Sequence, residues 1–272
     1  MRTLTLIVFT LLLSGCENMF FGQKTISQIC KEYPQMCNDL NPDAHCRREK
    51  AEIIRTRHDN LKQPSDPLKY DLLLHFEDYK KCISKAAQIE HIKYKEKKTL
   101  RVKGMLTAQR ELAQIARDTE DSKYPYLLHY HWSRFGRHES MLDFLAAEAA
   151  GQLEEPQLQI HLAEYYVKRD LDKTVLILYH ALELYESGDE VNPEIFYTLS
   201  SIFLKQERFP RAYIWAYIAK KYDVKDLDLV AIEALVRQVG KRPSKLKDIA
   251  DDYRSDIRSG DFKAPEHKPF VY

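Results

Sequence analysis

The sequence predicts an all-α protein in which a disulfide-stapled helical hairpin region precedes a stack of helical repeats. The 272 residues include only 8 glycines, and apolar residues recur at the three- and four-residue spacings of helices rather than alternating as in strands. Four further cysteines follow Cys16 in the first third of the chain. Large and small packing residues recur in the second half. We expect residues 25–104 to form the cysteine-containing region and residues 105–272 the repeat region with C-terminal capping helices.

The N-terminal segment has the features of a secretory signal. Arg2 supplies a positive charge and residues 3–13 form an apolar run, which is too short to span a bilayer because spanning takes about 17–25 apolar residues. The tetrad Leu-Ser-Gly-Cys at residues 13–16 resembles the lipobox of bacterial lipoproteins. The resemblance implies that residues 1–15 are removed as a signal peptide and that Cys16 is lipidated. An ordinary secretory signal with an incidental cysteine is the alternative.

A lipid anchor predicts a location in the cell envelope. Residues 16–24 form a lipidated tether that reaches roughly 25–30 Å when extended, so the folded part is expected close to the membrane. In lipoproteins of enteric bacteria an Asp after the lipidated Cys often signals retention in the inner membrane, and this chain has Glu17 there. We therefore expect an anchor in the outer membrane, facing the periplasm, rather than in the inner membrane.

Helix signals after the tether predict the hairpin. Thr25 and Gln28 have the spacing of a capping box. A helix is expected from Pro42-Asp43 to about Asp59, and Ser65-Asp66-Pro67 caps a second helix that runs past Cys82.

The hairpin geometry selects one disulfide pairing among the three that four cysteines allow. Cys46 and Cys82 are equally distant in sequence from the expected turn near Pro64, so antiparallel helices place them side by side. Cys30 and Cys37 remain as the second pair. A zinc site is disfavoured, because the chain has no Cys-x-x-Cys pair and exported thiols are usually oxidised.

The second half of the chain repeats a helical pattern. Leu128 and Trp132 are followed by Leu162 and Tyr166, then by Leu199 and Phe203, and a proline precedes each pair: Pro125, Pro156 and Pro193. In the third unit, large and small residues follow the tetratricopeptide pattern: Leu199, Ser200, Phe203, Phe209, Ala212 and Ala219. This part resembles tetratricopeptide or Sel1-like repeats, and a generic helical bundle is the alternative. Residues 226–239 and 244–258 are expected to form a capping helix pair.

The lipobox, the paired cysteines and the repeats together resemble an uncharacterised family of proteobacterial lipoproteins. That family has no known activity to transfer. The repeat resemblance implies a concave surface lined by the first helix of each pair. Residues at fixed offsets from the leading leucines are then expected to contact a partner: Arg134, Lys168, Lys205, Tyr126, Tyr130 and Tyr197. Such a surface suits an acidic or carboxylate-bearing protein or peptide. Alternatively, the cations only complement helix dipoles.

No sequence motif identifies a catalytic residue, a cofactor or a metal. His129, His131 and His138 do not have the i,i+4 spacing of a helical metal site. Ser244-x-x-Lys247 lacks the companion motifs of penicillin-binding enzymes. A net charge of +1 does not indicate nucleic-acid binding. Residues 92–104 are locally basic, and we interpret them as a solvated helix or linker.

The sequence therefore favours a lipid-anchored periplasmic adaptor or scaffold that binds a protein or peptide partner through the concave repeat surface. The alternative is a cell-envelope enzyme acting on cell-wall polymer, with a site assembled only in the fold.

Overall fold

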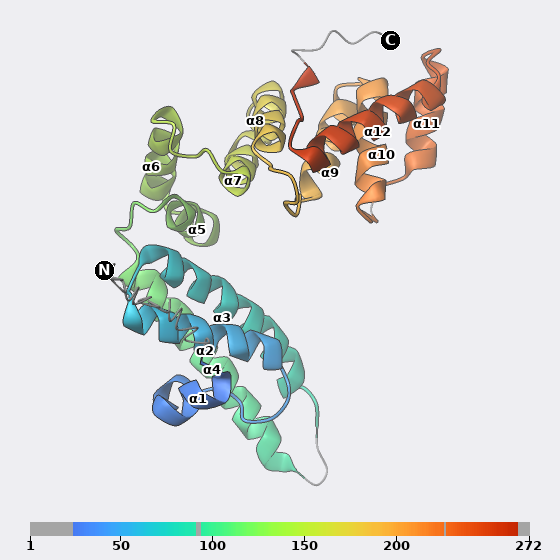
Figure 1. Cartoon of the computed structure of the whole chain (residues 1–272). Coiled ribbons are helices and arrows are strands. Elements are labelled where there is room, and N and C mark those ends of the chain that lie inside the picture. Colours follow the sequence, from blue (N-terminus) through green and yellow to red (C-terminus); the bar gives the residue numbers. More distant parts are fainter. Residues whose placement is uncertain (1–23, 91–93, 226, 266–272) are drawn as a thin grey trace, which may run out of the picture. The chain divides into compact units, whose positions relative to one another are not determined.

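The all-α prediction is confirmed. The computed structural model describes residues 24–90, 94–225 and 227–265, and in these ranges the chain forms twelve α-helices and one short 3₁₀ helix, with no strand (Figure 1). The chain divides into two compact units, residues 1–115 and 116–272. The division falls near the end of helix α4 (Lys95–Asp118), so the boundary expected after residue 104 lies inside a continuous helix. The expected lipidation site, Cys16, lies outside the described residues.

The first unit is built from short and long helices whose starts follow the capping signals. Its elements before α4 are α1 (Ile26–Glu32), the 3₁₀ helix η1 (Pro34–Met36), α2 (Arg47–Lys62) and α3 (Asp66–Ala87). Thr25 and Gln28 form the expected capping box. The Ser65 hydroxyl accepts a hydrogen bond from the backbone N–H of Leu68 at the start of α3. Both signals therefore act locally, as expected.

Helix α2 begins at Arg47, so the prediction that it begins at Pro42-Asp43 was wrong. The Asp43 carboxylate accepts hydrogen bonds from the backbone N–H of His45 and the side-chain amide of Asn41. It also pairs with Arg101, at 2.7 Å. These bonds fold residues 41–45 into a turn that competes with helical geometry. Cys46 then adopts a left-handed conformation, with φ 56°, and α2 starts after it.

Both predicted disulfides are confirmed. Cys46 and Cys82 are joined across the α2–α3 hairpin with their Cα atoms 5.9 Å apart. Cys30 and Cys37 are joined across η1 with a Cα separation of 5.7 Å. Both separations lie within the usual range for disulfides.

A buried polar network ties α4 to the turn before α2. The Tyr79 hydroxyl donates to Asn41 Oδ1 at 2.8 Å and accepts from the Asn41 backbone N–H at 3.1 Å. The Arg101 side chain is 2% exposed and donates to Asp43 and to the carbonyl of Ala86. Gly104 provides the space for this packing, since a Cβ there would collide with the Tyr79 hydroxyl. The network links three parts of the unit: the turn before α2, helix α3 and helix α4. Its hydrogen bonds compensate for the burial of the Arg101 charge.

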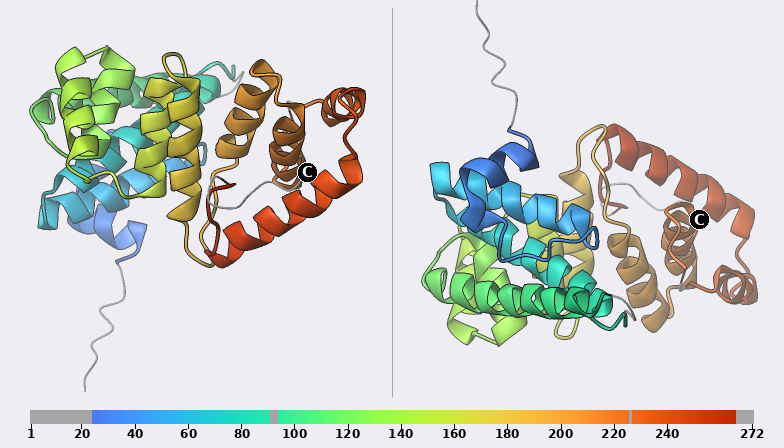
Figure 2. Two further views of the ribbon diagram at one scale, coloured as in Figure 1. Left: turned by 90° about the horizontal axis from the view of Figure 1, so that it is seen from above. Right: turned by 90° about the horizontal axis from the view of Figure 1, so that it is seen from below.

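The second unit contains three helix pairs followed by two further helices: α5 (Pro125–Phe135), α6 (His138–Ala149), α7 (Pro156–Tyr166), α8 (Leu171–Glu183), α9 (Glu194–Lys205), α10 (Phe209–Lys221), α11 (Leu229–Gln238) and α12 (Pro243–Ser259). The partners in each pair, α5 with α6, α7 with α8 and α9 with α10, pack on each other and lie side by side in Figures 1 and 2. Helices α11 and α12 both pack mainly on α10 rather than on each other. The second unit therefore has repeat-like packing of adjacent helices.

The residues that carried the repeat pattern are core residues. Leu128, Leu162 and Leu199 are all buried, and the Ser200 hydroxyl donates to the carbonyl of Ala212 across the α9–α10 contact. Small side chains at such positions allow helices to approach closely.

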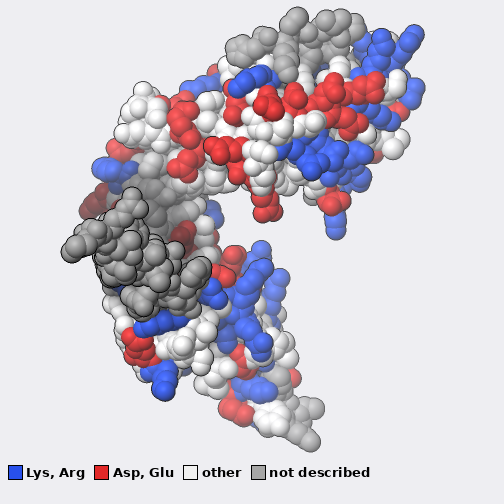
Figure 3. Space-filling model, in the orientation of Figure 1, with Lys and Arg blue, Asp and Glu red and all other residues white. Residues whose placement is uncertain are grey.

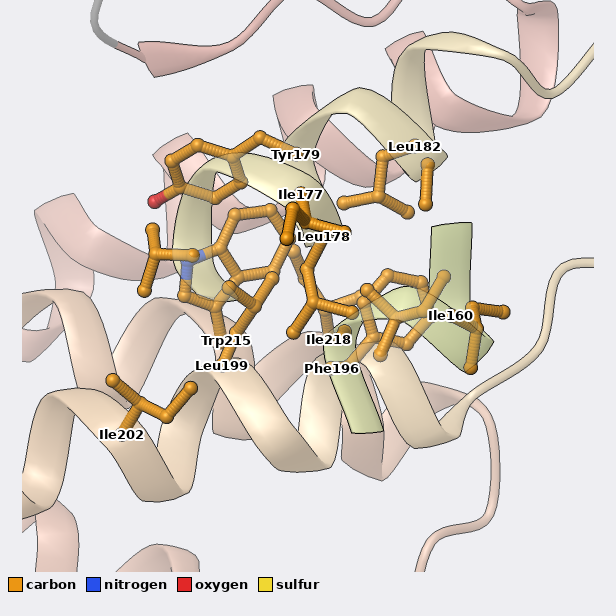
Figure 4. Close-up of a cluster of buried hydrophobic side chains, with 14 of the residues drawn as sticks. Ile160, Ile177, Leu178, Tyr179, Leu182, Phe196, Leu199, Ile202, Trp215 and Ile218 are labelled. Carbon is orange, nitrogen blue, oxygen red and sulfur yellow. The ribbon is translucent and has the colours of Figure 1, made fainter. Parts of the chain in front are cut away.

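The core of the second unit is centred on Trp215. This residue lies on α10 and is 1% exposed, and its ring stacks on Phe196 from α9 and contacts Tyr179 from α8 (Figure 4). Apolar residues from α7 to α10 thus meet in one cluster, which fixes the orientation of the first helices. In the described part of the chain, no helix is both long and apolar enough to cross a membrane.

Candidate functional site

The three predicted cations occupy equivalent places in the helix pairs. Arg134 lies in the last turn of α5, Lys205 is the last residue of α9, and Lys168 follows the end of α7 by two residues. All three are exposed. The second unit is not basic throughout, since acidic side chains gather over α12 (Figure 3). The row of cations is therefore a local feature of the first-helix ends.

The three predicted tyrosines differ in accessibility. Tyr197 on α9 is 39% exposed. Tyr126 is half-buried, and its hydroxyl donates to Glu155 at 2.7 Å. Tyr130 is only 4% exposed, so the expectation that its ring offers contact area to a partner was wrong. The guanidinium of Arg134 lies 5.6 Å from the centre of the Tyr130 ring. Tyr130 therefore supports a cation instead of lining a surface.

A recess opens between the first helices of the second and third pairs. Its volume is about 140 Å³. Its lining comes from α7, α8 and α9: Ile160, Ala163, Glu164, Val167, Leu178, Glu194, Ile195 and Thr198. Lys168 and Tyr197 are the immediate chain neighbours of two lining residues, Val167 and Thr198. The lining is mainly apolar, with the carboxylates of Glu164 and Glu194 and the hydroxyl of Thr198, and none of the predicted cations and tyrosines is among the lining residues.

Aromatic contacts on α5 and α7 extend this surface. The Tyr165 ring packs edge-on against Trp132, with centroids 5.9 Å apart. The guanidinium of Arg169 lies 4.0 Å from the centre of the Tyr165 ring, within the range of a cation–π interaction. Sequence reasoning did not select Tyr165 or Arg169. Arg169 lies in the turn after α7 rather than on the helix, so the i,i+4 spacing from Tyr165 was not a helical signal for this contact.

Two histidines and a carboxylate form a cluster between α5 and α7. The imidazole rings of His129 and His161 stack with centroids 3.8 Å apart and planes inclined by 15°. Glu164 contacts both rings: Oε2 lies 3.0 Å from His129 Nε2, and Oε1 lies 3.3 Å from His161 Nδ1. Gln157 lies 3.4 Å from the other nitrogen of His161. From the sequence we considered His129 and found no metal-ligand spacing around it, and we gave His161 no role.

Burial and pairing set the charge states of this cluster. Burial lowers the pKa of His129 below its ordinary value, although Glu164 opposes this shift. Burial alone would raise the pKa of Glu164, but hydrogen bonds from His129 and His161 outweigh it and lower the pKa to about 2. At neutral pH the cluster therefore contains an ionised carboxylate and a neutral His129.

The other residues considered for chemistry do not join this cluster. His131 is buried, and its Nε2 lies 2.9 Å from the carbonyl oxygen of Thr119. His138 is exposed at the start of α6. Lys247 lies 3.8 Å from Glu233 in an ion pair, and Ser244 is exposed on the first turn of α12. The Ser-x-x-Lys spacing thus has no supporting site around it.

The first unit has a larger and more open recess of about 470 Å³ beside the Cys46–Cys82 disulfide. Charged residues of both signs line it, including Arg48, Lys85 and Asp78. This mixture does not define a ligand of one charge, so we place the candidate site in the second unit.

Comparisons with known proteins give a family but no function. No curated protein and no solved structure matches the chain. One family model matches residues 13–217. This segment starts at the first residue of the Leu-Ser-Gly-Cys tetrad, includes both disulfides and the first two helix pairs, and ends within α10 of the third pair. Since the match covers most of the chain, the protein belongs to the family described as "Protein of unknown function (DUF2989)".

Proposed function

We propose that this protein is a lipid-anchored adaptor or scaffold of the cell envelope, and that its second unit binds a protein or peptide partner. The anchor would be Cys16, with the protein facing the periplasm from the outer membrane. Binding would use the first-helix surface, defined here as the α7–α9 recess with Lys168, Tyr197 and the Trp132–Tyr165–Arg169 contacts. In this proposal the helix pairs are a tetratricopeptide-like scaffold.

The observation that carries the proposal is the recess between α7 and α9. Ile195, which is 1% exposed, lies at its floor, and the partly exposed Val167 on its rim can contact a partner's apolar side chain. Exposed Lys168, Arg169 and Tyr197 on the same helices or directly after them supply the charge and aromatic area that interfaces favour. Arg134 and Lys205 extend the positive charge to the neighbouring helix ends. A partner segment with an apolar anchor and flanking carboxylates fits this combination.

The test is recovery of the partner from cells that make the protein. Arg134 and Lys168 are replaced together by Glu, proteins are crosslinked in intact cells, and co-purified material is quantified by mass spectrometry. The matched control carries Lys220→Glu and Lys245→Glu, which change the net charge equally at exposed positions of α10 and α12. Circular dichroism must first show equal helicity in all three proteins.

We expect wild type and control to recover the same partner, and the Arg134/Lys168 variant to lose most of it. The association should also weaken with salt in the wild type, because exposed charges are screened. Equal recovery with all three proteins would contradict the proposal.

The alternative, an enzyme acting on cell-wall polymer, finds one supporting observation in the His129–His161–Glu164 cluster. Three titratable groups lie within hydrogen-bond reach there, and Glu164 also lines the recess. However, a general base works best when its pKa lies near the working pH. The pKa of Glu164 is about 2, so this carboxylate is a poor proton acceptor at neutral pH. The cluster is better suited to holding a ligand than to acid–base catalysis.

A further inference from the structure

We propose that His129, His161 and Glu164 form a binding site for a divalent transition-metal ion of the Zn²⁺ type. Two imidazole nitrogens and one carboxylate are a donor set that Zn²⁺ accepts, with a water in the fourth position. Both helices contribute: His129 comes from α5, and His161 and Glu164 come from successive turns of α7. A bound ion would thus connect the first helices of two neighbouring pairs.

The spacing of the donor atoms supports this assignment. Two ligands bound to one tetrahedral Zn²⁺ at 2.0–2.1 Å lie roughly 3.3 Å apart. His129 Nε2 lies 3.0 Å from Glu164 Oε2, and His161 Nδ1 lies 3.3 Å from the other carboxylate oxygen, Oε1, so the carboxylate is within reach of both imidazoles through different oxygens. All three donor atoms lie within 4.8 Å of one another. The stacked rings must open so that both nitrogens face the ion, which requires rotation of the His161 side chain, 11% of which is exposed.

The surroundings support ligation by the imidazoles. The ring of His129 is buried and packs against Trp132 and Phe144, with ring centroids 5.7 and 6.0 Å apart, so its position on α5 is fixed by the core. Gln157 lies beside His161 Nε2. Its amide oxygen can accept the proton on that nitrogen once Nδ1 holds the ion, because the two ends of the amide are interchangeable by a flip.

The cluster is also accessible. The side chain of Glu164 is 49% exposed and lines the α7–α9 recess, so an ion and its remaining water ligand can enter from solvent. One neighbour opposes the ion: the positive charge of Arg134 acts on His129. Replacing Arg134 by a neutral residue should therefore strengthen metal binding, whereas the same replacement should weaken binding of an acidic partner.

The described residues contain one other group with metal-ligand spacing, Cys46, Glu49 and Cys82. Both thiols of that group are joined in a disulfide, so they do not ligate while oxidised. The experiment must therefore keep the disulfides intact and use a purification tag without histidines.

The test is Zn²⁺ titration of the full chain by isothermal calorimetry, with Co²⁺ absorption as a spectroscopic check on coordination. The variants are His161→Gln and Glu164→Gln. We choose these because Gln approximates the size of both side chains, and because the Glu164 side chain is 49% exposed, so the replacements should preserve the fold. The control is His138→Gln, which removes an exposed histidine of the same unit.

We expect one equivalent of Zn²⁺ to bind wild type and the His138 control. Each ligand variant should weaken binding by about 100-fold or more, since loss of only a hydrogen-bond partner of a metal ligand already costs roughly 10–100-fold. The Co²⁺ spectrum should be tetrahedral in wild type and disappear in both variants. Absence of binding to wild type, or equal binding to the ligand variants, would overturn the proposal. Because the assay needs no partner, its outcome is independent of the adaptor hypothesis.

Discussion

The two disulfides should stabilise the first unit by different amounts. In the chain-entropy model the stabilisation grows with the length of the closed loop. The sequence separation is 36 for Cys46–Cys82 and 7 for Cys30–Cys37. These loops correspond to about 3.8 and about 2.4 kcal/mol at 25 °C. Replacing both members of the long-loop pair by Ala should therefore cost about 1.5 kcal/mol more than the same change in the short-loop pair.

Urea unfolding can measure this difference because the units carry different probes. Both tryptophans of the chain, Trp132 and Trp215, lie in the second unit, so their fluorescence reports its unfolding. Far-UV circular dichroism reports the unfolding of both units. An unfolding transition that appears in circular dichroism but not in tryptophan fluorescence therefore belongs to the first unit. We expect the disulfide variants to shift that transition and leave the fluorescence transition unchanged. Equal costs for the two pairs would refute the loop argument, and an equal shift in fluorescence would refute the assignment to one unit.

Three further predictions concern the first unit and the anchor. Gly104→Ala should lower the free energy of unfolding by about 1–3 kcal/mol through overpacking against Tyr79, although Ala normally stabilises a helix. Urea unfolding measures this, with Lys103→Ala at an exposed neighbouring position as the control. A Gly104→Ala variant that is more stable than wild type would contradict the prediction. Burial raises the pKa of Tyr79 to about 12. The protonated hydroxyl therefore stabilises the fold fully below about pH 10, the pKa of tyrosine in the unfolded chain. This stabilisation should be lost as the pH rises towards 12. The difference in free energy of unfolding between wild type and Tyr79→Phe should therefore shrink from pH 8 to pH 11. A difference that stays constant over this range would contradict the prediction. Cys16→Ser should abolish incorporation of radiolabelled fatty acid, because a hydroxyl cannot form the thioether, and labelling at the wild-type level would exclude Cys16 as the anchor.

The hairpin was predictable because its signals are local. Capping by Ser65, a proline in the first turn and the symmetric positions of Cys46 and Cys82 specify two antiparallel helices without knowledge of the rest of the fold. The start of α2 was not predictable in this way. Asp43 is a good helix-start residue, but it bonds to Arg101, which lies 58 residues away in sequence. A long-range partner of this kind leaves no local pattern.

The candidate site shows the same limit. The spacing from the leading leucines selected Arg134, Lys168 and Lys205, which lie exposed at or just after the ends of α5, α7 and α9, and their role in binding a partner stays a prediction. The spacing did not predict that Tyr130 is buried, which depends on how neighbouring helices pack. The contact of His129 with His161 joins residues on different helices, and no spacing within one helix reveals it. The pair His161 and Glu164, at i and i+3, was the available signal for that cluster.

Site-specific photocrosslinking tests the proposed binding surface most directly. A photoreactive amino acid replaces Lys168 or Tyr197 in the first-helix surface, or Leu176, which is 49% exposed on the second helix α8. After irradiation of intact cells, we predict that one partner is crosslinked from positions 168 and 197 and not from position 176. Crosslinking of the partner from position 176 alone would contradict binding through the first helices.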